Sequence, residues 1–483
     1  MATTVAMPSI VSERAPFQLR TILAPLVALV IGAFMIMLDS TAMNVAVPGL
    51  VGSLHSTLPT MQWTITGYAL AQAAVIPLAG WLSDRWGARR IFLGAVVLFT
   101  LGSVLCATAQ SDTMLIACRV LQGLGGGVVL PIALAYTYRL SPPDKVGMVI
   151  GLLGIPITFA PALGPVMAGW LVEYASWRWI FLLNLPIGVA GLLVGLRGLP
   201  ALGRQRAPGL DLPGMLLGPL AFAALSYGVS EGSAGWTSAR TLGGLLVGGV
   251  ALVAFVLVEL RARTPLLELR VFQSRDFSLG IAAQWACQFA LYGTLFLVPL
   301  FLQQARGYGA FATGLLLLPE AIAAAIGMPL GGALFDRIGV RPLVVTGMSL
   351  VAAAALLLSR IGVTTQGADL IGPLALVGVG VGLMMMTLNT YLIQASPREL
   401  VGRVTSLTNA LVRVVTALAI ASLTTILTAR IATFRAAQGG RPAAGAAHTA
   451  FSTAIGDTFR VLLVVAVAGA ALGLGLRRPL KMR

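Results

Sequence analysis

The chain has 483 residues, of which 58% are hydrophobic and 10% charged, and its mean hydropathy is +0.92. Soluble globular domains carry about 25% charged residues, so this composition excludes a water-soluble core and indicates a protein of the lipid bilayer. The net charge of +16 fits contact with anionic lipid headgroups. A nucleic-acid-binding protein is disfavoured, because the sequence contains no compact basic domain.

Apolar segments long enough to cross a bilayer occur fourteen times along the chain. A hydrocarbon layer of about 30 Å requires about 20 helical residues, and proline or glycine within such a helix is tolerated in a bundle. In chain order the segments are 22–50, 61–82, 90–109, 112–138, 146–171, 179–198, 211–230, 241–260, 277–303, 311–335, 342–359, 369–395, 400–429 and 459–476. We therefore predict an all-α integral membrane protein with 14 transmembrane helices.

Lys and Arg are distributed unevenly between the two sides of these segments. The N-terminal segment, the even-numbered connections and the C-terminal tail hold 22 of the 32 basic residues. Basic residues concentrate on the cytoplasmic side of membrane proteins, so both termini are predicted to be cytoplasmic, in a multi-pass protein of the inner (plasma) membrane. The first apolar segment is too long for a cleavable signal peptide and is expected to remain as a span.

One ten-residue pattern occurs twice, 252 positions apart. Residues 80–89 read GWLSDRWGAR and residues 332–341 read GALFDRIGVR. Each copy joins two predicted spans, as in transporters built from internal repeats. We interpret these charged hairpins as a cytoplasmic gate that favours the outward-open state. Its residues are Gly80, Asp84, Arg85, Gly87, Arg89 and, as weaker counterparts, Asp336 and Arg337.

Two carboxyl groups are predicted to lie deep within spans. Asp39 and Glu320 are about ten and nine residues from the outer ends of their spans, which at ~1.5 Å per residue places both about 15 Å deep. A carboxylate there must be paired, hydrated or protonated, and reversible protonation is what coupling to a proton gradient requires. Asp39 is the preferred coupling residue. Glu320 either couples protons or selects substrate charge, and a structural ion pair is the alternative for both.

Two arginines are also predicted within spans. Arg119 lies about 11 Å deep, within side-chain reach of Asp39 if the first and fourth spans are neighbours, and completes the predicted proton-coupling set. Arg413 lies near mid-membrane, one helical turn after Asn409. Its alternative role is a clamp between helices of the second half.

Polar and thioether side chains within spans indicate a substrate cavity. Gln284, Gln288 and Tyr292 share one helix face, and Met35 and Met43 flank Asp39 with thioethers, which adapt to irregular apolar ligands. For each of these residues ordinary packing is the alternative. The predicted cavity set is Met35, Met43, Asn44, Gln122, Gln284, Gln288, Tyr292, Asn389, Asn409 and Arg413.

Machinery for enzymatic chemistry is not visible in the sequence. Cys106, Cys118 and Cys287 show no paired spacing, and the chain has no HExxH pattern, Cys/His cluster or phosphate loop. We predict a transporter that is not an enzyme, has no cofactor or metal, and is driven by a proton gradient.

Five motifs give the chain a family resemblance. They are the hairpin at 80–90, LIACRVLQG at 115–123, the glycine- and proline-rich run ending GPVMAG at 164–169, LDSTAMNVAVP at 38–48 and WRWIFLLNLPIG at 177–188. Together they resemble the major facilitator superfamily and, more narrowly, its fourteen-span drug:proton antiporters of the QacA and EmrB type. The span-five run resembles the antiporter motif, with Gly154, Pro161, Gly164, Pro165 and Gly169 on its helix. The chain departs from the family after Arg413, where Val414 to Ala417 replace a glycine-rich turn.

The resemblance implies a major facilitator fold with two six-helix bundles, at 1–200 and 271–483, and two inserted linker helices at 201–270. It implies export of lipophilic drugs, including cations, in exchange for protons by alternating access. Its partners would be the bilayer, protons and small lipophilic substrates. An exporter of a lipid or an endogenous metabolite is the alternative, and a non-transporting sensor is a further one. Whether a periplasmic adaptor protein takes part is left open.

Overall fold

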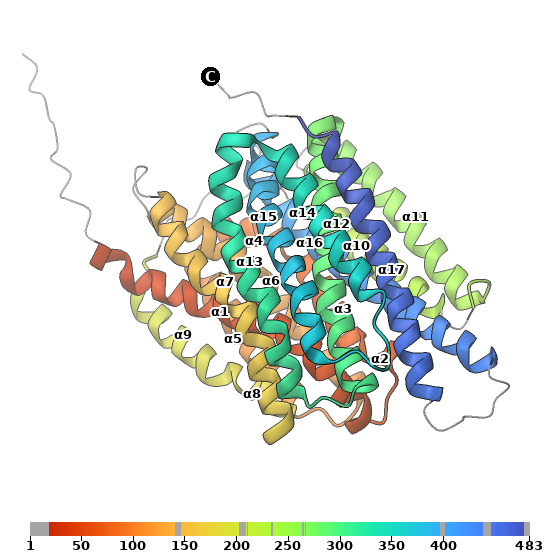
Figure 1. Ribbon diagram of the computed structural model, residues 1–483. Coiled ribbons are helices and arrows are strands. Elements are labelled where there is room, and N and C mark those ends of the chain that lie inside the picture. The colour runs from red at the N-terminus through yellow and green to blue at the C-terminus, as the bar shows by residue number, and fades with distance from the viewer. Residues whose placement is uncertain are drawn as a thin grey trace, which may run out of the picture.

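The structure is a computed structural model that describes residues 19–140, 146–201, 209, 211–232, 235–262, 265, 267–396, 401–437 and 446–477. These residues form helices joined by short connections (Figure 1). The first half contains α1 (Leu19–Ser53), α2 (Leu58–Met61), α3 (Trp63–Val75), α4 (Leu78–Trp86), α5 (Ala88–Ala107), α6 (Asp112–Leu140), α7 (Val146–Tyr174), α8 (Arg178–Leu182) and α9 (Asn184–Gly198). The chain is an all-α integral membrane protein, as predicted.

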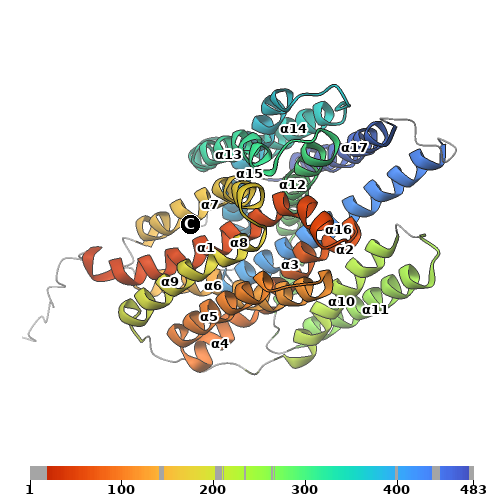
Figure 2. The same cartoon turned by 90° about the horizontal axis from the view of Figure 1, so that it is seen from below.

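The second half begins with an inserted pair, α10 (Leu212–Glu231) and α11 (Ala239–Arg261), followed by the short helix η2 (Leu269–Gln273). The remaining helices are α12 (Arg275–Leu300), η3 (Phe301–Ala305), α13 (Ala310–Ile338), α14 (Val340–Leu358), η4 (Gly367–Leu370), α15 (Ile371–Gln394), α16 (Val401–Ala437) and α17 (Ala446–Leu474). Helices α10 and α11 pack against each other, and α10 also packs against α3 and α16. Figure 2 shows this pair at the side of the two bundles.

By length and composition, twelve of the described helices can cross a membrane, or thirteen when the bent pair α3–α4 counts as one span. Helix α7, with 29 residues, occupies the position of the fifth predicted span. The total of fourteen spans stays a prediction.

Two segment predictions differ from the structure. The second predicted span is divided between α3 and α4, which meet at 52°, and Pro77, which has no backbone N–H, lies at the break. The last two helices are longer than the predicted segments 400–429 and 459–476, because α16 continues to Ala437 and α17 already begins at Ala446. Alanine is abundant on both sides of this connection and has the highest helix propensity, so both helices extend beyond their apolar segments.

The two bundles meet tightly at one end. A Cβ atom added to Gly169 of α7 would lie 2.2 Å from the carbonyl oxygen of Ala310 of α13, and one added to Gly314 would lie 2.4 Å from that of Pro165. The backbone N–H of Phe311 also donates to Glu173 over 2.8 Å. We call this end of the molecule the closed end. The helices of the two bundles lie further apart toward the opposite, open end (Figure 1).

The open end carries the two repeated hairpins. Gly87 joins α4 to α5 with φ of +93°, and Gly339 joins α13 to α14 with φ of +82°. Only glycine adopts positive φ readily, which explains why both copies of the repeat have glycine at this position. The sequence repeat is therefore also a structural repeat.

Candidate functional site

A buried ion pair lies at the centre of the first bundle. Asp39 of α1 and Arg119 of α6 are 2.6 Å apart between Oδ2 and Nη1, and neither side chain is exposed. The depths estimated from the sequence thus bring the two residues together. Because an unpaired charge in an apolar interior is costly, each partner makes the burial of the other possible.

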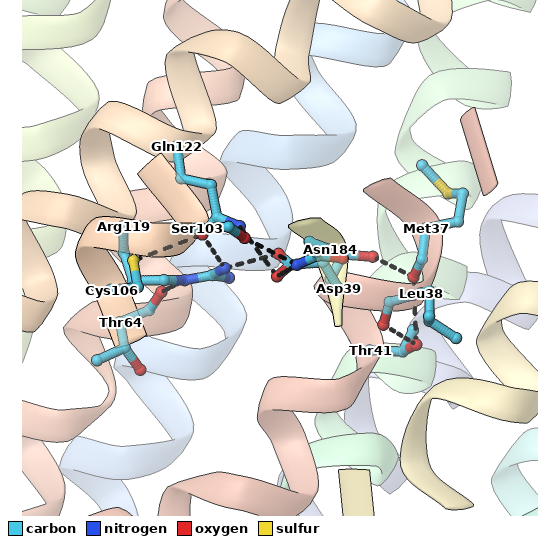
Figure 3. Close-up of polar contacts among 11 residues, drawn as sticks. Met37, Leu38, Asp39, Thr41, Thr64, Ser103, Cys106, Arg119, Gln122 and Asn184 are labelled. Atoms are coloured by element: carbon cyan, nitrogen blue, oxygen red, sulfur yellow. Dashed lines mark hydrogen bonds and ion pairs between the residues drawn. The ribbon is translucent and has the colours of Figure 1, made fainter. Parts of the chain in front are cut away.

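Amide and hydroxyl groups complete this ion pair as a network (Figure 3). The side-chain amides of Gln122 and Asn184 both donate to Asp39 Oδ1, over 3.1 and 3.0 Å. The same two amides donate to the Ser103 hydroxyl, over 2.6 and 2.9 Å. Asp39 therefore accepts three hydrogen bonds from three residues, which matches the acceptor capacity of an ionised carboxylate.

Arg119 makes further contacts with α3. Its Nε donates to the Thr64 carbonyl oxygen over 3.1 Å, and its Nη1 also donates to Gln122 over 2.7 Å. The guanidinium lies over the Tyr68 ring at 3.9 Å, a favourable cation–π distance. Its Nη2 is buried and has no hydrogen-bond partner among the described residues. One donor of this arginine is thus available for a group that enters the site.

Three members of this network were not predicted as site residues. Asn184 belongs to the motif at 177–188, and its amide within an apolar segment was a usable signal. Ser103 and Tyr68 stand in spans without any pattern that separates them from packing residues. Their roles depend on how α5 and α3 are rotated against α6, which only the tertiary structure specifies.

Glu320 lies in the second bundle, on α13. It is 2% exposed, and neither carboxyl oxygen has a hydrogen-bond partner among the described residues. Its helix is in backbone contact with α15, since a Cβ atom on Gly378 would lie 2.1 Å from the Glu320 carbonyl oxygen. In contrast to Asp39, Glu320 has no cation beside it in the described residues. Its carboxyl group is therefore available either for a proton or for a cationic ligand.

The polar stripe of α12 is buried within the second bundle. Gln284 donates to Asn389 of α15 over 2.8 Å, and Gln284 and Gln288 each retain a buried carbonyl oxygen without a partner in the described chain. Tyr292 and Arg413 are half-buried and lie within electrostatic range of Tyr68 in the other bundle. Asn409, one turn before Arg413 on α16, is also half-buried.

The predicted methionines are packing residues in this conformation. Met35 and Met43 have no exposed surface; Met35 belongs to an apolar cluster of the first bundle, and Met43 to one that extends across both bundles. Asn44 is 1% exposed, and its Oδ1 has no partner among the described residues. A role in ligand contact stays a prediction for all three, and it requires another conformation for the methionines.

The charged hairpin is anchored within its own bundle. Arg89 donates to the Leu196 carbonyl oxygen of α9, Asp84 is half-buried, and Arg85 and Gly80 are exposed. Arg337 of the second copy is exposed, while the side chain of Asp336 lies outside the described residues. The role of these residues as a cytoplasmic gate stays a prediction.

The antiporter-like run on α7 faces both α1 and α13. A Cβ atom on Gly164 would lie 2.1 Å from the Thr41 hydroxyl oxygen of α1. Gly169 and Pro165 form the closed-end contact with α13 described above. The side-chain surroundings of Gly154 and Pro161 lie outside the described residues.

We expect Gly169→Ala to open the closed end. The added Cβ atom would collide with the main chain of α13, which cannot move aside without separating the bundles. In a background lacking native cysteines, a membrane-impermeant maleimide should label Val45→Cys, which is buried in the same apolar cluster as Ala168 and Ala310, faster in the Gly169→Ala protein. Gly94→Ala on α5 is the control, since Gly94 is exposed and a Cβ atom there meets nothing within 4 Å. Equal labelling rates would contradict the steric role of Gly169.

The sequence was also compared with those of known proteins and protein families. The sequence model of the family described as the Major Facilitator Superfamily matches residues 29–420 of the chain. The chain belongs to the major facilitator superfamily. It is 37% identical over 371 residues to the multidrug resistance protein B homolog of Mycobacterium tuberculosis (strain H37Rv), covering 76% of this chain and 68% of the relative. It is 30% identical over 407 residues to the lincomycin resistance protein LmrB of Bacillus subtilis, covering 84% of this chain and 85% of the relative.

Solved structures of facilitator proteins share the fold. A peptide transporter of the POT family in an auto-inhibited form is similar, with a TM-score of 0.67 at 17% identity, over 95% of this chain and 98% of that one. A bacterial homolog of the lysosomal transporter Spinster, in an inward-facing and unoccupied conformation, has a TM-score of 0.65 at 17% identity, over 95% and 97%. At these identities the likeness concerns the architecture alone.

Proposed function

We propose that this facilitator exports lipophilic compounds, including cations, in exchange for protons. The observation that carries the proposal is the carboxyl of Asp39, fully buried and held by donors from three residues inside one bundle. Relatives named for multidrug and lincomycin resistance support the substrate class. The closed contact at one end and the separation at the other support alternating access.

We further propose that the open end faces the cytoplasm of a plasma-membrane protein with both termini inside. The excess of Lys and Arg at this end supports the assignment. The conformation is then inward-open, with the closed end sealing the route to the outside. An adaptor protein is not part of this proposal.

The exchange follows from the hydrogen bonds of Asp39. In this scheme the Asp39 carboxyl of the inward-open state is ionised and paired with Arg119. A proton arriving from outside would neutralise it, leave Arg119 as a buried cation without its counter-charge and give the carboxyl one hydrogen to donate, so the network with Arg119 would have to rearrange. A ligand shifts a two-state equilibrium only by binding the states differently. Proton and substrate do so here by acting on the same network.

Substrate uptake into inside-out vesicles under an imposed pH gradient tests the proposal. We expect wild-type protein to concentrate a lipophilic cation such as ethidium inside the vesicles, and a protonophore to abolish the accumulation. Accumulation that survives the protonophore would contradict proton coupling. An absence of both gradient-driven transport and counterflow would contradict transport altogether and favour a sensor.

We expect Glu320→Gln to impair export of cationic compounds and to leave neutral ones nearly unchanged. The carboxyl has no cation among its described neighbours, so a positively charged ligand can supply the missing partner, and glutamine removes the charge while keeping the shape. Vesicle uptake of a cationic and a neutral substrate, compared in the same preparation, measures the difference. Equal loss for both substrates would instead assign Glu320 to proton coupling.

A further inference from the structure

An apolar pocket lies where the two bundles meet the inserted helices. It is a crevice with one open side, whose roughly 430 Å³ of space includes the part outside its mouth, and it is bounded by α3, α10, α11, α16 and the connection at Leu267. Leu70 and Ala74 come from α3, Phe222 from α10, Phe255 from α11, and Ala410 and Val414 from α16. Every residue that lines it has an apolar side chain or is glycine. The nearest carboxylates, Asp211 and Glu259, lie behind Gly214 at the open-end edge, so the crevice itself suits an apolar ligand.

The pocket lies beside the contact between α3 and α16, on the open-end side of that contact. Ala69 and Leu70 of α3 pack against Ala417 of α16 in one apolar cluster. The pocket residues Ala74, Pro77 and Ala410 follow on the open-end side of this contact. Whatever fills the pocket therefore lies between the two bundles and holds them apart on this side.

Among the described residues, the hydrogen bonds from α10 to the two bundles lie beyond this point. Near the closed end, Gln62 donates to the Ser230 hydroxyl over 2.6 Å, and Thr425 donates to the Val229 carbonyl oxygen over 2.8 Å. Toward the open end, the glycines Gly214 and Gly218 of α10 line the pocket instead of long side chains. The inserted pair thus covers one side of the pocket, and α10 is hydrogen-bonded to both bundles near the closed end.

The residues around the pocket indicate which kind of molecule fills it. The outer surfaces of α10 and α11 expose long apolar side chains, such as Leu216 at 66% and Leu246 at 69%, so the molecules beside these helices are membrane lipids. At the open-end edge Arg261 and Arg270 are exposed. One Nη of Arg270 donates to the carbonyl oxygens of Leu260 and Ala262, and exposed basic side chains at such an edge attract anionic lipid headgroups. The acids there are turned inward: Asp211 caps α10 through the Gly214 N–H, and Glu259 accepts from the Leu267 N–H.

We propose that this pocket binds the acyl chain of a phospholipid, whose phosphate lies beside Arg261 and Arg270. The chain fills the angle between α3 and α16 and stabilises the conformation that is open at the hairpin end. When the bundles rock to close that end, the chain has to leave. The site is separate from the Asp39 network, and only the assignment of the lipid to the cytoplasmic leaflet rests on the proposed function.

Photolabelling of the purified full chain tests the site. The protein is reconstituted in bilayers of phosphatidylethanolamine and phosphatidylglycerol that contain a phosphatidylglycerol with a diazirine on its acyl chain. After illumination, labelled peptides are mapped by mass spectrometry. We expect label on the α16 peptide with Ala410 and Val414, which are 3% and 4% exposed and can be reached only from within the pocket. Label on the outer face of α11 serves as the internal standard.

Two variants that fill the pocket with a larger side chain are used, so that the test does not depend on the correct folding of a single mutant. Ala74→Phe and Val414→Phe fill the pocket from opposite walls, and each should lower the α16 label several-fold relative to α11. Gly94→Phe on α5 is the control, because Gly94 is exposed and a Cβ atom there meets nothing within 4 Å, and it should leave the ratio unchanged. Arg261→Gln with Arg270→Gln should lower the α16 label, whereas Arg240→Gln near the other end of α11 should not.

Three results would overturn the proposal. The first is an unlabelled α16 peptide in the wild-type protein, and the second is a label that both filling variants leave unchanged. The third is displacement of the label by the lipophilic cation tetraphenylphosphonium, which would make the pocket a substrate site. None of these measurements requires transport, so their failure is distinguishable from failure of the export function.

Discussion

The Asp39→Asn variant is expected to lose gradient-driven export completely, to the level of vesicles without the protein. Asparagine keeps the size of the side chain and can still accept from Asn184 or Gln122, but it cannot bind and release a proton. Substrate counterflow without a gradient should persist, because it requires only binding and the movement of the bundles. Export and counterflow measured in the same proteoliposomes therefore separate coupling from transport.

Asp457→Asn is the matched control for this substitution. Asp457 forms a partly exposed ion pair with Arg460 over 2.8 Å on α17, away from the first bundle, and its amide variant should export normally. If Asp39→Asn protein still accumulates substrate under a pH gradient, the coupling role of Asp39 is wrong. Loss of both export and counterflow would indicate that the aspartate is needed for the structure.

We expect Arg119→Gln to destabilise the protein strongly and the double variant Asp39→Asn/Arg119→Gln to recover much of the loss. Removal of one partner leaves a buried carboxylate without its cation, which costs about 3–5 kcal/mol. Removal of both charges leaves only neutral amides, which can still hydrogen-bond to one another. Unfolding in mixed micelles, followed by near-ultraviolet circular dichroism, measures the free energies of all four proteins for a double-mutant cycle.

Arg460→Gln provides the comparison for an exposed pair. Its side chain is 68% exposed, and such pairs contribute about 0–1 kcal/mol, so the effect on the free energy of unfolding should be small. If the double variant is as unstable as Arg119→Gln alone, the loss arises from the stacking of Arg119 on Tyr68 and its bond to Thr64 instead of from the ion pair.

The sequence predicts the architecture better than the details of the site. Long apolar segments identify the helices, and the depths of Asp39 and Arg119 bring the ion pair together, because depth follows from residue count alone. Ser103 and Asn184 escaped prediction because their contact with Asp39 depends on helix rotation. The bend at Pro77 and the helical residues beyond 429 escaped because proline in membrane helices is often tolerated and because apolar length marks the bilayer, not the end of a helix.

Glu320 shows the limit of arguments from depth. It lies at nearly the same predicted depth as Asp39, yet the described residues give it no cation and no hydrogen-bond donor. Equal depth did not imply an equal environment, because the environment is made by the neighbouring helices. The two carboxyl groups therefore need separate experiments.

Through Gly164, α7 connects the segment around Asp39 to the contact between the bundles at the closed end. The run Leu38 to Thr41 contains the aspartate and also touches Gly164 of α7. The next residue, Pro165, touches Gly314 across the boundary between the bundles. Main-chain atoms and small side chains make these junctions, so α7 has little freedom to absorb a shift of α1. A small displacement around Asp39 would thus reach the closed end without passing through the substrate.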